Sequence, residues 1–164
     1  MKKIYSFVAA LVVAMVVMVS CSSSAYQAQL DAAKAAIEAK DATTAFAKVK
    51  EIIAGDKVTA DDAVIATMYA LNAYAIETQK ANGQIDAATN LDLCKQVVAA
   101  YNKAKSFPAA DVDAANSAIK AAAGYDVMST AAGYVQSVAT LENAIQAAQQ
   151  AAAEEEEGEE EEEE

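Results

Sequence analysis

The chain contains no histidine, and all twelve of its basic residues are lysines. Without an imidazole, it lacks the side chain that most often serves as a general base near neutral pH or as a metal ligand. Without arginine, it lacks the side chain best suited to bidentate recognition of phosphate. It also carries no glycine-rich phosphate-binding motif. We therefore expect no enzymatic activity, no cofactor, no metal site built from histidine and no nucleic-acid partner.

Proline and glycine are scarce, with one proline and five glycines, and no segment after residue 24 alternates polar and apolar residues as a half-buried strand would. Alanine, the best helix former, supplies about a quarter of the residues. The sequence therefore predicts an all-α protein of about six helices, with residues 25–153 forming a single domain.

The N-terminal segment is basic at Lys2 and Lys3 and then almost entirely apolar over residues 4–19. Such a segment is typical of a secretory signal peptide. A helix that crosses a bilayer needs about 20 apolar residues, and this segment is shorter than that. It ends at Met18-Val19-Ser20-Cys21, which resembles the lipobox of bacterial lipoproteins. The resemblance implies that residues 1–20 are cleaved and that Cys21 becomes a lipidated N-terminus, followed by a short tether over residues 21–24.

The same resemblance implies anchoring in the lipid bilayer through fatty chains such as palmitate on Cys21. Ser22 stands where an aspartate favours inner-membrane retention in enterobacterial members of the family. We therefore expect an outer-membrane protein of the cell envelope that faces the periplasm. Loss of Lys2 and Lys3 with the signal changes the net charge from −12 to −14 (−12 − 2 = −14).

Candidate caps and terminators divide the remaining chain into helices. We expect them over residues 25–40, from Asp41 to Gly55, from Thr59 to Asn82, from Asp86 or Thr89 to Ser106, from Pro108 to Gly124, and from Asp126 onward. The third of these is apolar over the widest face, which places it at the centre of the core. Gly133 lies inside the last helix, where we expect it to mark a close helix crossing.

Apolar residues at helical spacing give each helix a predicted buried stripe. The stripes are Tyr26, Leu30, Ala33 and Ile37; Phe46, Val49 and Ile53; Val64, Ile65, Met68, Tyr69, Leu71, Ala75 and Ile76; Leu91, Cys94, Val98 and Tyr101; Val112, Ala115, Ile119 and Ala122; and Val127, Ala131, Tyr134, Val138, Leu141, Ile145 and Ala148.

Residues 38–53, EAKDATTAFAKVKEII, resemble the turn and second helix of a tetratricopeptide repeat (TPR), with Ala45 at the small-residue position. Helix pairs starting near residues 25 and 59 fit the 34-residue period of that repeat, but the next pair, near residue 108, does not. Two architectures stay open: a TPR-like stack of antiparallel helix hairpins and an irregular helical bundle.

Few side chains are candidates for a functional site. Lipidation would consume Cys21 and leave Cys94 alone, as a buried small hydrophobe, a reactive thiol or one half of an intermolecular disulfide. Tyr69 and Tyr74 either line a ligand groove or lie at the rim of the core. The adjacent acids Asp61 and Asp62 are interpreted as first-turn residues favoured by the helix dipole.

Ten of the last eleven residues, 154–164, are glutamates. Their mutual repulsion and their unfavourable position at a helix C-terminus predict a disordered tail. Such a tail keeps the protein in solution, binds Ca²⁺ or Mg²⁺ weakly, or contacts a basic partner.

Three functions remain open. The first is a membrane-anchored lipoprotein that acts as a helical protein-interaction scaffold, with an envelope protein as its partner. The second is a structural lipoprotein that spaces the membrane from the cell wall. The third is a binder of a small ligand or a divalent cation.

Overall fold

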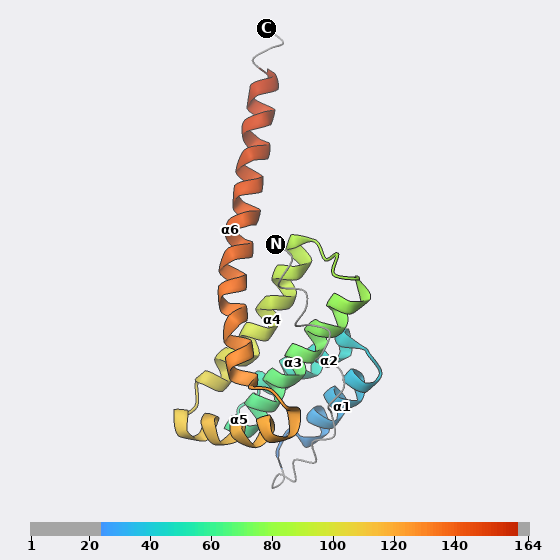
Figure 1. Cartoon of the computed structure of the whole chain (residues 1–164), viewed down its shortest axis with the longest axis vertical. Coiled ribbons are helices and arrows are strands. Elements are labelled where there is room, and N and C mark those ends of the chain that lie inside the picture. The colour runs from blue at the N-terminus through green and yellow to red at the C-terminus, as the bar shows by residue number, and fades with distance from the viewer. Residues whose placement is uncertain (1–23, 161–164) are drawn as a thin grey trace.

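The computed structural model describes residues 24–160, and all regular elements in this range are α-helices (Figure 1). The helices are α1 (Gln27–Glu38), α2 (Ala42–Ile53), α3 (Ala60–Lys80), α4 (Ala87–Lys105), α5 (Ala109–Ala123) and α6 (Val127–Glu160). The predicted all-α fold with six helices is thereby confirmed. The expectations for residues 1–23, including cleavage after Ser20 and lipidation of Cys21, lie outside the described residues.

Helix α3 forms the centre of the core, as its wide apolar face predicts. Every residue from Asp62 to Ala73 is buried, and all five other helices contact α3. A helix that is apolar on all sides is stable only when neighbours cover every face. In Figure 1, α1 to α4 pack side by side, α5 lies across one end of the bundle, and α6 runs along α4.

The predicted caps of α2 and α3 are confirmed. The backbone N–H of Thr44 donates to Asp41 at 3.0 Å, and Thr59 and Asp62 form a reciprocal capping box. In that box the Asp62 N–H donates to the Thr59 hydroxyl at 3.2 Å, and the Thr59 N–H donates to the Asp62 carboxylate at 3.1 Å. Each contact satisfies a backbone donor that has no partner inside its helix.

Asp86, Pro108 and Gly124 mark the start of α4 and the two ends of α5. Asp86 caps α4, since it accepts the Thr89 N–H at 2.9 Å, so Thr89 lies inside the helix. Pro108 is the residue before α5 rather than its first residue, and Gly124 ends that helix with a left-handed φ of 78°. The positive φ explains the glycine, because other residues adopt this conformation at a steric cost.

The predicted stripe of α4 is only partly correct. The structure buries Leu93, Val97, Ala100 and Ala104 together with Cys94, whereas the predicted Leu91, Val98 and Tyr101 are half-buried. The reason is that α4 packs against both α3 and α6. A helix between two neighbours buries its surface on more than one side, so a single stripe does not describe it. Smaller shifts bury Ile52 rather than Ile53 and Ala123 rather than Ala122.

Helix α6 contains 34 residues, which corresponds to about 51 Å at 1.5 Å per residue. Figure 1 shows it leaving the bundle and projecting beyond the start of α4. The sequence predicts a disordered glutamate tail from residue 154; the structure describes α6 as far as Glu160, and residues 161–164 lie outside the described residues. Extending an existing helix adds one hydrogen bond per residue without a new nucleation step, which favours this continuation.

The close helix crossing expected at Gly133 is wrong. Gly133 is exposed, and a Cβ built at this position meets no atom within 4 Å. None of the helices within residues 24–160 combines the length and the apolar composition that spanning a bilayer requires.

Candidate functional site

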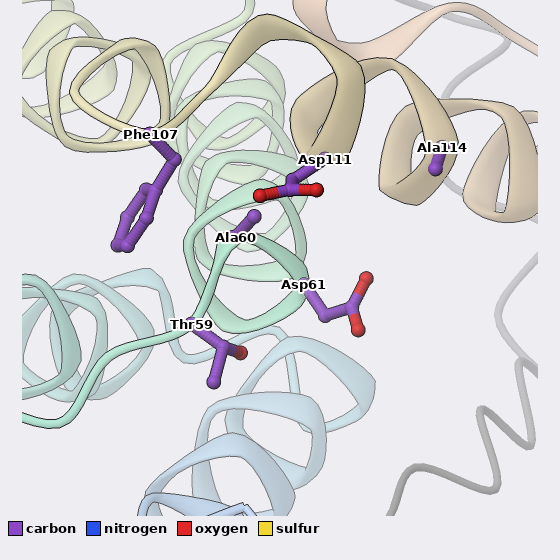
Figure 2. A pocket seen from close by; sticks show the side chains of 6 residues that line it. All are labelled: Thr59, Ala60, Asp61, Phe107, Asp111 and Ala114. Atoms are coloured by element: carbon purple, nitrogen blue, oxygen red, sulfur yellow. The ribbon is translucent and has the colours of Figure 1, made fainter.

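A pocket of about 440 Å³ opens between the start of α3 and the start of α5 (Figure 2). Its walls come from two segments that are far apart in the sequence, the first turn of α3 and the connection from α4 into α5. The lining residues are Thr59, Ala60, Asp61, Phe107, Asp111 and Ala114.

Two carboxylates give the pocket its charge. Asp61 and Asp111 lie in the first turns of α3 and α5, where the positive ends of the helix dipoles favour acids. Both side chains are exposed, and neither forms an ion pair or a side-chain hydrogen bond with a described residue. Figure 2 shows them at the same opening, one from each helix. The pair is therefore free to receive a cationic group.

The aromatic wall of the pocket is Phe107, which is half-buried. The Lys103 ammonium lies 5.9 Å from the centre of its ring, within the range of a cation–π contact. Sequence reasoning missed both Phe107 and Asp111. Their position next to Pro108 indicates the start of a helix, but nothing in the sequence places that start beside Thr59.

The structure separates the two adjacent acids of α3. Asp62 is 2% exposed and completes the capping box, while Asp61 is exposed at the pocket. Their interpretation as first-turn acids is confirmed. The separation follows from helix geometry, since neighbouring residues point in directions about 100° apart.

The two tyrosines proposed for a ligand groove lie in different surroundings. Tyr69 is 7% exposed and belongs to the core. Its burial raises the pKa of the phenol to about 12, with a smaller contribution from the negative charges of Asp31 and Glu38. Tyr74 is half-buried at the junction of α3, α4 and α6, where its hydroxyl donates to the Asn90 side-chain oxygen at 2.9 Å. The two rings therefore do not line one groove.

Cys94 lies at the same junction as Tyr74. Its side chain is 1% exposed, and its sulfur is 3.7 Å from the Asn90 side-chain oxygen. Burial raises the pKa of the thiol, and the Tyr74 hydroxyl opposes that shift in part. A thiol with a raised pKa carries little thiolate at neutral pH, so the position favours the interpretation as a buried small hydrophobe.

Among the residues with described side chains, 24–151, the structure brings together no group of three or more potential metal ligands. Comparisons of the chain with known protein families, with curated proteins and with solved structures find no match. What the chain does must therefore be inferred from its own residues and their arrangement.

Proposed function

We propose that the protein is a lipid-anchored helical interaction module of the bacterial cell envelope. The lipobox-like segment ending at Cys21 supports the anchor, and the all-α fold provides surfaces for protein contacts. The proposal locates the protein at the outer membrane, facing the periplasm, with an envelope protein as its partner.

The projection of α6 is the single observation that carries this proposal. The described chain enters α1 at the end of the bundle where α5 lies, and α6 leaves the bundle at the opposite end (Figure 1). Residues 21–24 span at most about 10 Å, so an acylated Cys21 would hold the body close to the bilayer. The part of α6 from residue 146 onward, called the α6 arm below, would then extend away from the membrane, where it can reach a partner.

The arm has few contacts with its own body. Between Val127 and residue 151, where the side chains of α6 are described, Ile145 is the last half-buried residue, and residues 146–151 are all exposed. A long exposed helix buries little apolar surface of its own, so it contributes little to the stability of the fold. Its exposed side chains are therefore accessible to another molecule, which supports a role in contacts with a partner.

Crosslinking in intact cells with identification by mass spectrometry tests this function. The natural chain should crosslink to one envelope protein, and deletion of residues 146–164 should abolish that crosslink. A Cys21→Ala variant, which removes the acylation site, serves as the control for membrane attachment. Absence of any specific crosslink from the natural chain would contradict the proposal, as would failure of Cys21 to incorporate radioactive palmitate.

The pocket between α3 and α5 favours a second candidate function, the binding of a small cationic ligand. Two carboxylates without ion-pair partners and an aromatic ring are suited to a primary ammonium group. Calorimetry with an alkylammonium ion and with Ca²⁺ tests this candidate. Binding should be lost in the Asp61→Asn, Asp111→Asn double variant and retained in Asp113→Asn, which changes an exposed acid of α5 outside the pocket. Binding that the double variant retains, and that deletion of residues 154–164 removes, would assign the cation to the tail.

A further inference from the structure

Helix α6 is attached to the body in two unequal parts. At its start, Val127 and Ala131 are completely buried, and Asp126 caps the helix by accepting the Ser129 N–H at 2.9 Å. Asn116 of α5 binds the same helix start. Its side-chain amide N–H donates to the Asp126 carboxylate, and its side-chain oxygen accepts the Met128 N–H. This first part of α6 is an integral piece of the core.

The second part of α6, from Tyr134 to Ile145, lies on α4 without a single buried residue. Its inward side chains are half-buried, and the residues concerned are Tyr134, Val138, Leu141 and Ile145. One ion pair joins this part to α4, between Lys95 and Glu142 at 3.0 Å, with both side chains more than two-fifths exposed. An exposed ion pair adds little stability, so this part of α6 is held mainly by half-buried apolar side chains, whereas the first part is anchored by completely buried ones.

Gly133 lies at the boundary between the two parts. It lies between Tyr134 and Ala131, which is the last buried residue among the described side chains of α6, and no side chain or turn requires a glycine there. Its φ is not positive, so the position accepts any residue of the right size. A glycine inside a helix lowers the cost of leaving the helical conformation, which makes this position a natural hinge.

The second part of α6 covers a defined group of side chains on α3 and α4. The Tyr134 ring meets Tyr74 edge to face, with centroids 4.9 Å apart. Tyr74 and Cys94 both contact the side-chain oxygen of Asn90 in α4, at 2.9 and 3.7 Å, so the ring of Tyr134 packs on the same junction that holds Cys94. Removal of Tyr134 would therefore open the junction around Cys94 to solvent.

We propose that α6 is a hinged cover, which opens at Gly133 and exposes the Tyr74–Cys94 junction while residues 24–131 remain folded. Regions with few buried contacts open at a lower free-energy cost than the whole domain unfolds. The opening concerns the free protein and does not depend on the proposed envelope function. If a partner binds α6 differently in its open and closed positions, it shifts this equilibrium by that difference in affinity.

The Cys94 thiol can report this opening, because its side chain is 1% exposed while α6 is closed. The experiment uses the full chain with Cys21→Ala, in a mild detergent that keeps the apolar segment 4–19 in solution, so that Cys94 is the only thiol. The rate at which a maleimide labels Cys94 is measured over a series of low urea concentrations. Global stability of each variant is measured in parallel by urea unfolding.

Local opening predicts that labelling at low urea is nearly independent of urea, since little surface is exposed. Ala132→Gly adds a second flexible residue beside the hinge and should accelerate labelling about fivefold. Gly133→Ala, which fits because its Cβ meets no atom, should slow labelling by a similar factor. Ala118→Gly is the matched control, an equal change at an exposed position inside α5 that should leave labelling at low urea unchanged.

The opposite pattern would overturn the hinge. If labelling has the full urea dependence of global unfolding in every variant, Cys94 is exposed only when the domain unfolds. If Ala132→Gly and Ala118→Gly accelerate labelling equally, the effect is global and Gly133 has no special position.

Discussion

The ring of Tyr134 in α6 meets the ring of Tyr74 in α3 edge to face, with centroids 4.9 Å apart and planes at 81°. This contact joins the outermost helix to the central one. Tyr74 also donates a hydrogen bond to Asn90 of α4, so a single side chain connects three helices. The position of α6 therefore depends on a junction about two turns from its first residue, Val127.

The first prediction concerns the strength of this ring contact. Tyr134→Leu and Tyr74→Leu each remove it while keeping an apolar side chain, and their combination forms a double-mutant cycle. We expect a coupling free energy of about 0.5–1.5 kcal/mol, the usual value for an edge-to-face pair. Urea unfolding of the four proteins measures it. Strictly additive losses in the double variant would show that the rings do not stabilise each other.

The second prediction concerns Gly55, which leaves room for the Tyr26 ring. A Cβ at Gly55 would lie 1.8 Å from the Tyr26 hydroxyl oxygen, so the ring must move in Gly55→Ala. Its hydroxyl would then lose the Lys57 N–H, which donates to it at 3.5 Å. We expect a loss of about 1–3 kcal/mol in the free energy of unfolding. In a Tyr26→Ala background the same change should cost less than about 0.5 kcal/mol, and an equal cost in both backgrounds would contradict the packing.

The third prediction concerns stability in alkaline solution. Burial raises the pKa of Tyr69 and of Tyr125 to about 12, with Asp31 and Glu38 adding to the effect at Tyr69 and Asn72 opposing it at Tyr125. The unfolded chain loses these protons near pH 10, whereas the folded protein retains them. Unfolding therefore releases protons between about pH 10 and 12, and the free energy of unfolding falls as pH rises through this window.

Urea unfolding between pH 9 and 11.5 tests this slope, with tyrosinate absorbance as an independent readout. Tyr69→Phe should make the slope shallower, because one of the groups with a raised pKa is gone. Tyr26→Phe is the control, since that side chain is half-buried outside this group. An identical slope in the natural chain and in Tyr69→Phe would show that Tyr69 does not contribute.

The fourth prediction concerns Asp126, which caps α6 and contacts α5. The Ser129 N–H, the Asn116 amide and the Lys120 ammonium all hold the pKa of this carboxyl below its usual range. Asp126→Ala should lower the free energy of unfolding by about 1 kcal/mol, the typical cost of losing a helix cap. Because the pKa is lowered by folding, the contribution of Asp126 is present at neutral pH and disappears as pH falls through the folded-state pKa. The natural chain and the variant should therefore converge in stability at acid pH, and a constant difference down to pH 2 would contradict the assignment.

The fifth prediction concerns the glutamate-rich end of α6. Deletion of residues 154–164 should change the free energy of unfolding by less than about 0.5 kcal/mol, because the described side chains of α6 beyond Ile145, those of residues 146–151, are all exposed. The far-UV circular dichroism should lose the signal of about seven helical residues, those of 154–160. A marked loss of stability would mean that this segment contacts the body.

Local signals in the sequence were sufficient to locate most helix ends. Asp41, Thr59 with Asp62, and Gly124 act within a few residues of the chain, so their roles follow from short-range rules. The central position of α3 also follows from the sequence, because its apolar residues cover all its faces. The face that α4 buries could not be predicted in the same way, since it depends on the presence of α6 on its other side.

The candidate pocket shows the same limit. The sequence identifies Asp61 as a first-turn acid but not Asp111, and only the crossing of α5 over the end of the bundle brings both to one opening with Phe107. At Gly133 the expectation from the sequence was wrong. A glycine inside a helix suggested a close crossing, whereas the structure leaves the position open on all sides.

The sequence by itself determined that this protein is helical, where most of its helices begin and end, and which of them occupies the centre. These properties arise from interactions between residues close together in the chain and from the distribution of apolar side chains around each helix. Only the tertiary structure decided which faces of α4 and α6 meet, which side chains gather at the pocket, and how far α6 extends beyond the body. Those features depend on helix orientations, which are set by side-chain packing between segments distant in the sequence.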